Sequence, residues 1–261
     1  GLIVHDLGNA YTAQVVQSID EALVGAGYEL VLHTTHGHHH KEAIYVDILT
    51  HGMADGLLML IPLGPTPYLR QLRDRQFPYV ILTDNEHLDP ASPTVTTSSA
   101  QGAYDLTRYL IELGHRRIGF IGGRSDFVSA AERLDAYKTA LADHNLPLDP
   151  LLVQHGDYQY RSGYAAATIL LDLPQPPTAI FAANDLMAFG VYEVARSRGM
   201  RIPEDLSVAG FDDVPQAATM HPGLTSVRQP LTEIGHLAAH MLLQYIQDPE
   251  RPAERLVLPT E

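Results

Sequence analysis

The residues best suited to bind a small molecule directly follow two short apolar runs. Asn184 and Asp185 follow the first run, and Asp212 and Asp213 follow the second. Such runs are typical of buried strands in a parallel sheet, and ligands bind beyond the carboxyl ends of those strands. Asn184 offers donors and acceptors to a hydroxylated ligand, although either residue of its pair could instead cap the following helix. We expect one of the two later aspartates to cap the next short helix and the other to accept two sugar hydroxyls.

Arginine and tyrosine side chains are candidates for further ligand contacts. Arg133 lies early in a predicted helix after Gly122 and Gly123, where its planar guanidinium either reaches a ligand or lies on a solvated helix face. Tyr158 and Tyr11 both follow predicted strands. An aromatic face suits the C–H face of a sugar ring, whereas the alternative for each tyrosine is core packing or an exposed loop.

The sequence contains no pattern that indicates catalysis or a bound metal. It has no Cys, which excludes disulfides, thiolate metal sites and Cys nucleophiles. The histidines of the run 36–40 could bind a divalent metal, but without a carboxylate or Cys set at ligand spacing we favour a solvated loop. The run 120–125 matches no phosphate-binding pattern and predicts a tight turn. We therefore expect no enzyme activity, no cofactor and no metal.

Composition indicates a folded protein with an acidic surface. Of the 261 residues, 45% are hydrophobic and 18% are charged, and the formal net charge is −14. An acidic surface repels the phosphate backbone, so we expect this chain alone to bind DNA poorly. No apolar run is long enough to span a membrane, and no signal peptide is visible. We expect a cytoplasmic protein with no membrane partner.

Strand-like runs alternate with amphipathic stretches along the whole chain. One helix is predicted by the apolar positions 15, 16, 19 and 23 before Gly25, and another by positions 103, 106, 110 and 113 before Gly114. This alternation predicts an α/β fold with parallel sheets and helices on both faces.

Two breaks in the pattern indicate two lobes. A turn-rich connector covers 88–93, and an extended stretch covers 224–230. We therefore expect an N-terminal lobe of 1–97 plus 230–248 and a C-terminal lobe of 98–228 plus 250–261. The chain would cross three times between two Rossmann-like lobes, and a ligand would lie in the cleft between them.

Four stretches together resemble the lactose-repressor (LacI) family of bacterial regulators, and the resemblance extends over essentially the whole chain. They are 114–121 (GHRRIGFI), 183–190 (ANDLMAFG), 202–213 (IPEDLSVAGFDD) and 224–230 (LTSVRQP). The family's core resembles the type I periplasmic sugar-binding proteins, and a helix-turn-helix head precedes it. That head is absent from this sequence, so operator DNA would be bound only through a part of the protein that is missing here.

The resemblance implies roles for individual residues. The effector-binding positions of the family fall on Asn9, Tyr11, Asp84, Ser129, Arg133, Tyr158, Asn184 and Asp212. Two departures concern the hinge and the ligand: Thr97-Ser98 replaces a common Asp-Asn pair, and Ala136 replaces a common glycine. The second departure is mild, because alanine suits a helix better than glycine.

The resemblance favours the effector-sensing core of a regulator that forms a homodimer and binds a small sugar or sugar derivative. The alternative is a soluble sugar-binding receptor of an ABC transporter, which has the same fold and cleft. The runs 114–121 and 225–230 look more like those of regulators. An enzyme on a related two-lobed fold has no motif to support it.

Overall fold

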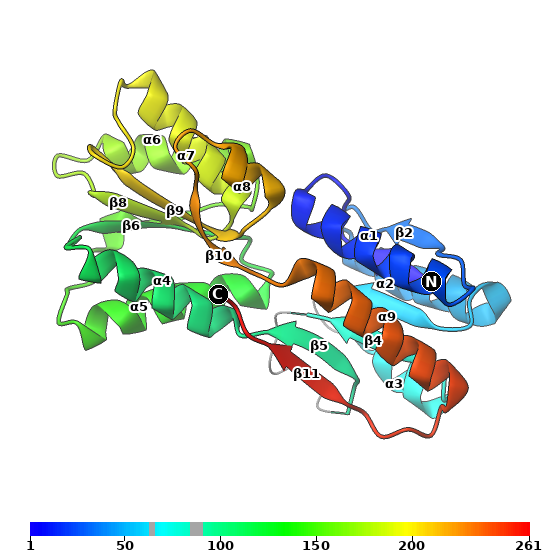
Figure 1. The fold of residues 1–261 in the computed structure, drawn as a ribbon. Coiled ribbons are helices and arrows are strands. Elements are labelled where there is room, and N and C mark those ends of the chain that lie inside the picture. Colours follow the sequence, from blue (N-terminus) through cyan, green and yellow to red (C-terminus); the bar gives the residue numbers. More distant parts are fainter. Residues whose placement is uncertain (63–65, 84–90) are drawn as a thin grey trace. The chain divides into compact units, whose positions relative to one another are not determined.

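The computed structural model describes residues 1–62, 66–83 and 91–261, and the chain folds into two compact units. The first unit comprises Gly1–Thr97 and Pro230–Pro259, and the second comprises Ser98–Gln229 and Thr260–Glu261. Each unit is built on its own sheet with parallel strand pairs and helices on both faces (Figure 1). The predicted α/β class with two parallel sheets is confirmed.

The first unit has a sheet with the strand order β11-β5-β4-β3-β1-β2. Helices α1 and α9 cover one face of it, and α2 and α3 pack on the other. The strands are β1 (Leu2–Val4), β2 (Leu32–Thr34), β3 (Leu57–Leu60), β4 (Tyr79–Leu82), β5 (Thr94–Thr97) and β11 (Arg255–Leu258). The helices are α1 (Ala10–Gly25), α2 (His39–Ile48) with a π-helical turn (Leu49–Met53), α3 (Tyr68–Asp74) and α9 (Leu231–Gln247).

The second unit has a sheet with the strand order β10-β9-β8-β6-β7. Its strands are β6 (Ile118–Gly122), β7 (Val153–His155), β8 (Ala179–Ala182), β9 (Ser207–Asp212) and β10 (Thr225–Arg228). Its helices are α4 (Ser99–Glu112), α5 (Val128–Asp143), α6 (Tyr160–Leu171), α7 (Asp185–Ser197) and α8 (Pro215–Thr219), with a 3-10 turn (Pro150–Leu152) before β7. Figure 1 shows α4 and α5 on one face of this sheet and α6 and α7 on the other.

The last strand belongs to the first unit, so the assignment of 250–259 to the C-terminal lobe is wrong, whereas residues 260 and 261 do belong to the second unit. β11 pairs in parallel with β5, from Arg255 opposite Thr94 to Leu258 opposite Thr97. The preceding helix, α9, packs on this same sheet, and the short segment after it returns the chain to the sheet's open edge. Burial of Leu258 in the core of the first unit favours this pairing.

The chain passes between the units at three points, and the second unit holds these points close together. The Ser98 hydroxyl accepts a hydrogen bond from the Thr260 N–H over 3.0 Å. Arg228 and Glu261 exchange two backbone hydrogen bonds, with N···O distances of 2.7 and 3.1 Å. Ser98, which belongs to the Thr97-Ser98 pair that replaces the common Asp-Asn of the family, therefore anchors the end of the chain.

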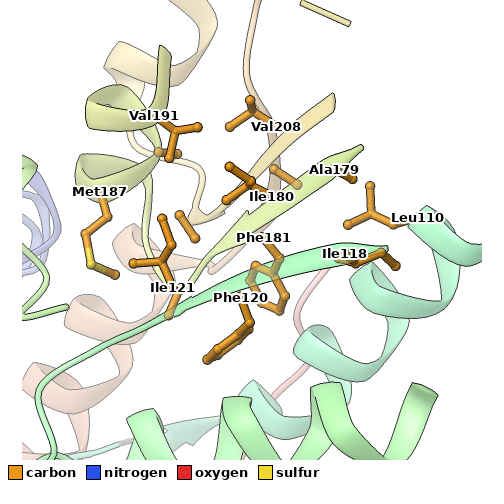
Figure 2. Packing of buried hydrophobic residues seen from close by; sticks show 14 of the residues in the cluster. Leu110, Ile118, Phe120, Ile121, Ala179, Ile180, Phe181, Met187, Val191 and Val208 are labelled. Carbon is orange, nitrogen blue, oxygen red and sulfur yellow. The ribbon is translucent and has the colours of Figure 1, made fainter. Parts of the chain in front are cut away.

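Along β6 and β8, successive side chains point to opposite faces of the second sheet, and both faces are buried. Phe120 pairs with Phe181 across β6 and β8, and their rings pack edge to face at 5.1 Å between centroids. Ile121 and Ile180 point to the opposite face, where Met187 of α7 packs (Figure 2). These apolar contacts fix the strand ends that carry the polar residues described below.

Helices α6 and α7 pack backbone to backbone through two glycines. A Cβ atom on Gly163 would overlap the Met187 carbonyl oxygen, and one on Gly190 would overlap the Tyr160 carbonyl oxygen. We predict that Gly163→Ala destabilises the protein by about 1–3 kcal/mol, because the helices must move apart. Gly25→Ala, at the end of α1 with no atom within 4 Å of the added methyl group, is the control and should be neutral or stabilising. Urea unfolding of both variants measures this, and equal stabilities would contradict the prediction.

Candidate functional site

Five of the predicted effector-binding residues gather at the carboxyl edge of the second unit's sheet. Because the strand pairs in this sheet are parallel, β7, β8 and β9 all end there. Tyr158 follows β7, Asn184 follows β8, and Asp212 is the last residue of β9. Ser129 and Arg133 come from the first turns of α5.

Arg133 is buried and joins three elements of the second unit. Its Nε–H donates to Ser99 Oγ over 2.9 Å, and one terminal nitrogen donates to the Ala183 carbonyl over 2.6 Å. The guanidinium carbon lies 3.7 Å from the centre of the Phe211 ring, a cation–π distance. With only 3% of its surface exposed, Arg133 does not lie on a solvated helix face. It fixes the positions of the residues that precede Asn184 and Asp212.

Asn184 caps α7, so the choice between it and Asp185 as the cap is settled. Its Oδ1 accepts from the Met187 N–H over 3.0 Å, and its Nδ2 donates to the Tyr158 carbonyl over 3.1 Å. Asp185 is fully buried and accepts from the Ser226 hydroxyl over 2.5 Å and from the Val214 N–H over 2.8 Å. The side-chain amide of Asn184 thus holds the segment that follows β7 close to the carboxyl end of β8.

Asp212 and Asp213 form a strained corner at the end of β9. Their φ angles are +111° and +54°, values that residues other than glycine rarely adopt. Asp212 Oδ1 accepts from Gln229 Nε2 over 2.8 Å, and Asp213 Oδ2 accepts from Arg228 Nε over 2.7 Å. The prediction that one of these carboxylates caps the next helix is wrong, because no side chain caps α8. Instead of capping α8, the two carboxylates accept hydrogen bonds from Arg228, the last residue of β10, and from Gln229, which follows it.

Tyr158 lies over the backbone that follows β6. Its hydroxyl is 3.3 Å from Ser129 Oγ, and its ring stacks on Phe127 with 5.7 Å between centroids. A Cβ atom on Gly123 would overlap the Tyr158 ring, so glycine is required for this approach. The tyrosine is half-buried and adopts a φ of +67°. Such local strain is characteristic of residues that are held in place for binding.

In the first unit, Asn9 and Tyr11 have structural contacts. Asn9 caps α1, with its Oδ1 accepting from the Thr12 N–H over 2.7 Å and its Nδ2 donating to Asp6 over 3.1 Å. Tyr11 packs against the apolar core beneath α1, which was the alternative to a ligand contact. Asp84, the third residue predicted from this unit, lies outside the described residues.

Three histidines of the run 36–40 have described side-chain contacts. His36 Nε2 lies 2.9 Å from Thr34 Oγ1, and the rings of His38 and His40 are 5.6 Å apart. In the part of the chain that the structure describes, no group of three His, Asp or Glu side chains could hold a metal ion. Within the same residues, no helix has the length and apolar character needed to cross a membrane.

Comparison with known proteins gives a consistent result. Residues 107–261 match the family model described as a periplasmic binding protein-like domain. The HTH-type transcriptional repressor PurR of Edwardsiella ictaluri is 34% identical over 98% of this chain and 75% of its own length. The structure of a CelR–cellobiose complex superposes with a TM-score of 0.89 at 34% identity, covering 100% of this chain and 81% of that one. A LacI family regulator from Enterococcus faecium with bound ribose has a TM-score of 0.89 at 27% identity, covering 100% and 95%.

The chain belongs to the LacI family of transcriptional regulators. It corresponds to the effector-binding core of that family, and the resemblance stated from the sequence is confirmed. The named relatives are repressors and regulators, which decides against the alternative of an ABC transporter receptor. Two of the LacI-type structures contain a sugar, cellobiose in one and ribose in the other.

Three residues of this LacI-type site were not predicted from the sequence. Gln229 contacts Asp212, whereas Ser99 and Phe211 surround the guanidinium of Arg133. Gln229 stands in the stretch 224–230 that carried the family resemblance, so its motif was a usable signal. Phe211 likewise stands in such a stretch, 202–213, whereas Ser99 lies outside all four stretches and gave no such signal.

Asp185 provides a stability test that depends on pH. Burial raises its pKa to about 7, although the hydrogen bonds from Ser226 and Val214 act in the opposite direction. A carboxyl that holds its proton more tightly when folded contributes stability at low pH, and that contribution is lost as the pH rises through the folded pKa. We predict that the wild type loses about 3 kcal/mol relative to Asp185→Asn between pH 5 and pH 8. Denaturant unfolding at several pH values measures this, and a constant difference would contradict it.

Proposed function

We propose that this chain senses a small hydroxylated metabolite, of the sugar type, and passes its occupancy to a DNA-binding head. The observation that carries the proposal is the cluster at the carboxyl edge of the second unit. There a carboxylate on strained backbone, a buried guanidinium and a tyrosine ring lie on adjoining elements. Carboxylates accept hydrogen bonds from sugar hydroxyls, and an aromatic face suits the apolar face of a sugar ring.

The proposal assigns a role to each of the main residues. Asp212 accepts hydrogen bonds from the ligand, and Tyr158 provides the stacking face. Arg133 and Asn184 position these two through the contacts described above. Asn9, Tyr11 and Asp84 of the first unit are proposed to add contacts, on the strength of the family resemblance alone.

A ligand panel tests this proposal. Ribose and cellobiose, which are bound in related structures, head the panel, followed by other mono- and disaccharides and by nucleobases. A ligand at 100 times its dissociation constant stabilises the folded chain by about 2.7 kcal/mol, which a thermal-shift measurement resolves. A panel in which nucleobases stabilise the chain and no sugar does would contradict the sugar class, because the same polar cluster would then recognise ring nitrogens.

We also propose that the chain forms a homodimer, since a regulator presents two heads to two half-sites. The proposed surfaces are 10–26 and 45–51 in the first unit, and 186–198 and 216–221 in the second. Val24 and Ile48 of the first two segments are 62% and 39% exposed, and a dimer contact over these segments would bury both apolar side chains.

Light scattering at micromolar concentration tests the dimer. We expect about twice the chain mass of 28.7 kDa. The variant Val24→Glu with Ile48→Glu should shift the mass towards the monomer, because two apolar contacts would be replaced by charges. A wild-type chain that scatters as a single species of about 29 kDa would contradict the proposal.

The remaining parts of the proposal follow from the relatives. Their names describe repressors of transcription, so we propose that this chain has no catalytic activity and acts in the cytoplasm, where the DNA lies. The operator would be bound by the helix-turn-helix part of the full protein.

A further inference from the structure

Asp185 is a buried carboxyl group for which neither helix capping nor ligand binding accounts. It is the first residue of α7 and is fully buried, yet Asn184 caps that helix. Its two oxygens point instead towards the end of β9 and towards β10. Oδ2 accepts the Val214 N–H, and Oδ1 accepts the Ser226 hydroxyl. A carboxyl group that is buried at a high desolvation cost and accepts two donors is expected to have a specific role.

The hydrogen bonds of Asp185 reach two consecutive backbone N–H groups, those of Asp213 and Val214. Ser226 Oγ, which donates to Asp185, itself accepts the Asp213 N–H over 3.1 Å. The Val214 N–H reaches Asp185 directly over 2.8 Å. Both peptide N–H groups that follow Asp212 are therefore held by Asp185, one directly and one through Ser226.

These peptide groups follow the strained corner of the site. Positive φ angles at Asp212 and Asp213 persist only where the surroundings fix them. The approach of the carboxylate depends on a glycine, because a Cβ atom on Gly210 would overlap Asp185 Oδ1. Three elements thus meet at this corner, through Asp185 of α7, Gly210 of β9 and Ser226 of β10. The corner sets the direction of the Asp212 side chain.

We propose that Asp185 is a positioning residue for Asp212: together with Ser226 it clamps the backbone at the end of β9 and so orients the carboxylate that meets the effector. This inference rests on the proposed function for the role of Asp212. The clamp itself is a property of the ligand-free chain, so the two parts are tested separately.

Amide hydrogen exchange in the ligand-free chain, followed by NMR, tests the clamp. In Asp185→Ala the amides of both Asp213 and Val214 should exchange about 10- to 100-fold faster, since each loses its direct or indirect hydrogen bond to the buried carboxyl group. In Ser226→Ala only the Asp213 amide should do so. Tyr137→Phe, which removes a buried hydrogen bond to Ile118 at the far end of β6, controls for general destabilisation.

The outcome depends on the pattern and not on overall stability. Acceleration at both amides in one variant and at one amide in the other supports the clamp. Equal acceleration across the second unit, as in Tyr137→Phe, overturns it. If Asp185→Ala does not fold, Ser226→Ala and Asp185→Asn decide. Asn keeps one acceptor oxygen, so exchange should change only at the Asp213 and Val214 amides, and equal acceleration across the second unit would overturn the clamp.

A double-mutant cycle tests whether the clamp acts through Asp212. Calorimetry with ribose and with cellobiose is carried out on the wild type, Ser226→Ala, Asp212→Ala and the double variant. If the clamp positions Asp212, Ser226→Ala should weaken binding several-fold in the wild type and hardly at all in the Asp212→Ala background. Equal losses in both backgrounds overturn the positioning role. If neither sugar binds the wild type, the proposed sugar class fails, whereas the exchange pattern still decides the clamp.

Discussion

Asp212→Ala should weaken effector binding about ten- to more than a hundredfold, because a hydrogen bond to a charged group contributes about 1.5–3 kcal/mol. The variant should also be less stable by about 1–3 kcal/mol. Gln229 is only 3% exposed, and its amide would lose the acceptor 2.8 Å away. Calorimetry with the bound sugar from the panel and denaturant unfolding measure the two effects.

Two controls separate binding from stability. Asp212→Asn keeps an oxygen that can accept from Gln229, and asparagine tolerates a positive φ, so this variant should be nearly as stable as the wild type. It should nevertheless bind the effector more weakly than the wild type, because it lacks the charged carboxylate. Asp135→Ala changes the net charge equally on a side chain that is 71% exposed, and it should bind like the wild type. If Asp212→Ala binds as tightly as the wild type, the assignment of Asp212 to the effector is wrong.

Arg133→Ala should have the largest effect on stability, about 3 kcal/mol or more. It leaves Ser99 Oγ and the Ala183 carbonyl without their donor in a buried site and removes the stacking on Phe211. At roughly 2–4 °C per kcal/mol, the melting temperature should fall by about 6–12 °C. Differential scanning calorimetry of the ligand-free chain measures this.

Arg133→Lys and Arg70→Ala are the matched variants. Lysine keeps the charge and can donate to one partner, but it lacks the planar fork, so we expect an intermediate loss. Arg70 of α3 has a side chain that is 83% exposed, and its removal should change stability by no more than about 0.5 kcal/mol. Arg133→Ala and Arg70→Ala melting at the same temperature would show that the buried contacts contribute little.

Strands that consist of apolar runs were predictable from the sequence, whereas a strand of mostly polar residues was not. The apolar runs of β6 and β8 stand out, and the polar residues that follow them lie where a parallel sheet brings them. β5 lies between β11 and β4 and is fully buried, but with three threonines and one valine it contains no apolar run that would predict a strand. The sheet to which β11 belongs depends on an open edge beside β5, which no local pattern of 255–258 encodes.

At the site, residue types were predictable but partners were not. Asn184 and Asp185 are both good helix caps, and the choice depends on Ser226, which lies 41 positions away and accommodates the aspartate. The same holds for Arg133, since a helix position alone does not reveal that a serine, a carbonyl and a phenyl ring surround its guanidinium. Long-range contacts of this kind decide between functional and structural roles for the same residue.

The way in which the chain divides between the units has a consequence for its biosynthesis. The second unit is one uninterrupted segment, Ser98–Gln229, plus two terminal residues, so a ribosome delivers nearly all of it before it begins the closing part of the first unit. The first unit must wait for α9, whose residues Leu231, Ile234 and Leu242 complete the core against α1 and the sheet. Until α9 emerges, α1 alone covers this face of the sheet, so the nascent first unit exposes apolar surface that makes it prone to aggregation.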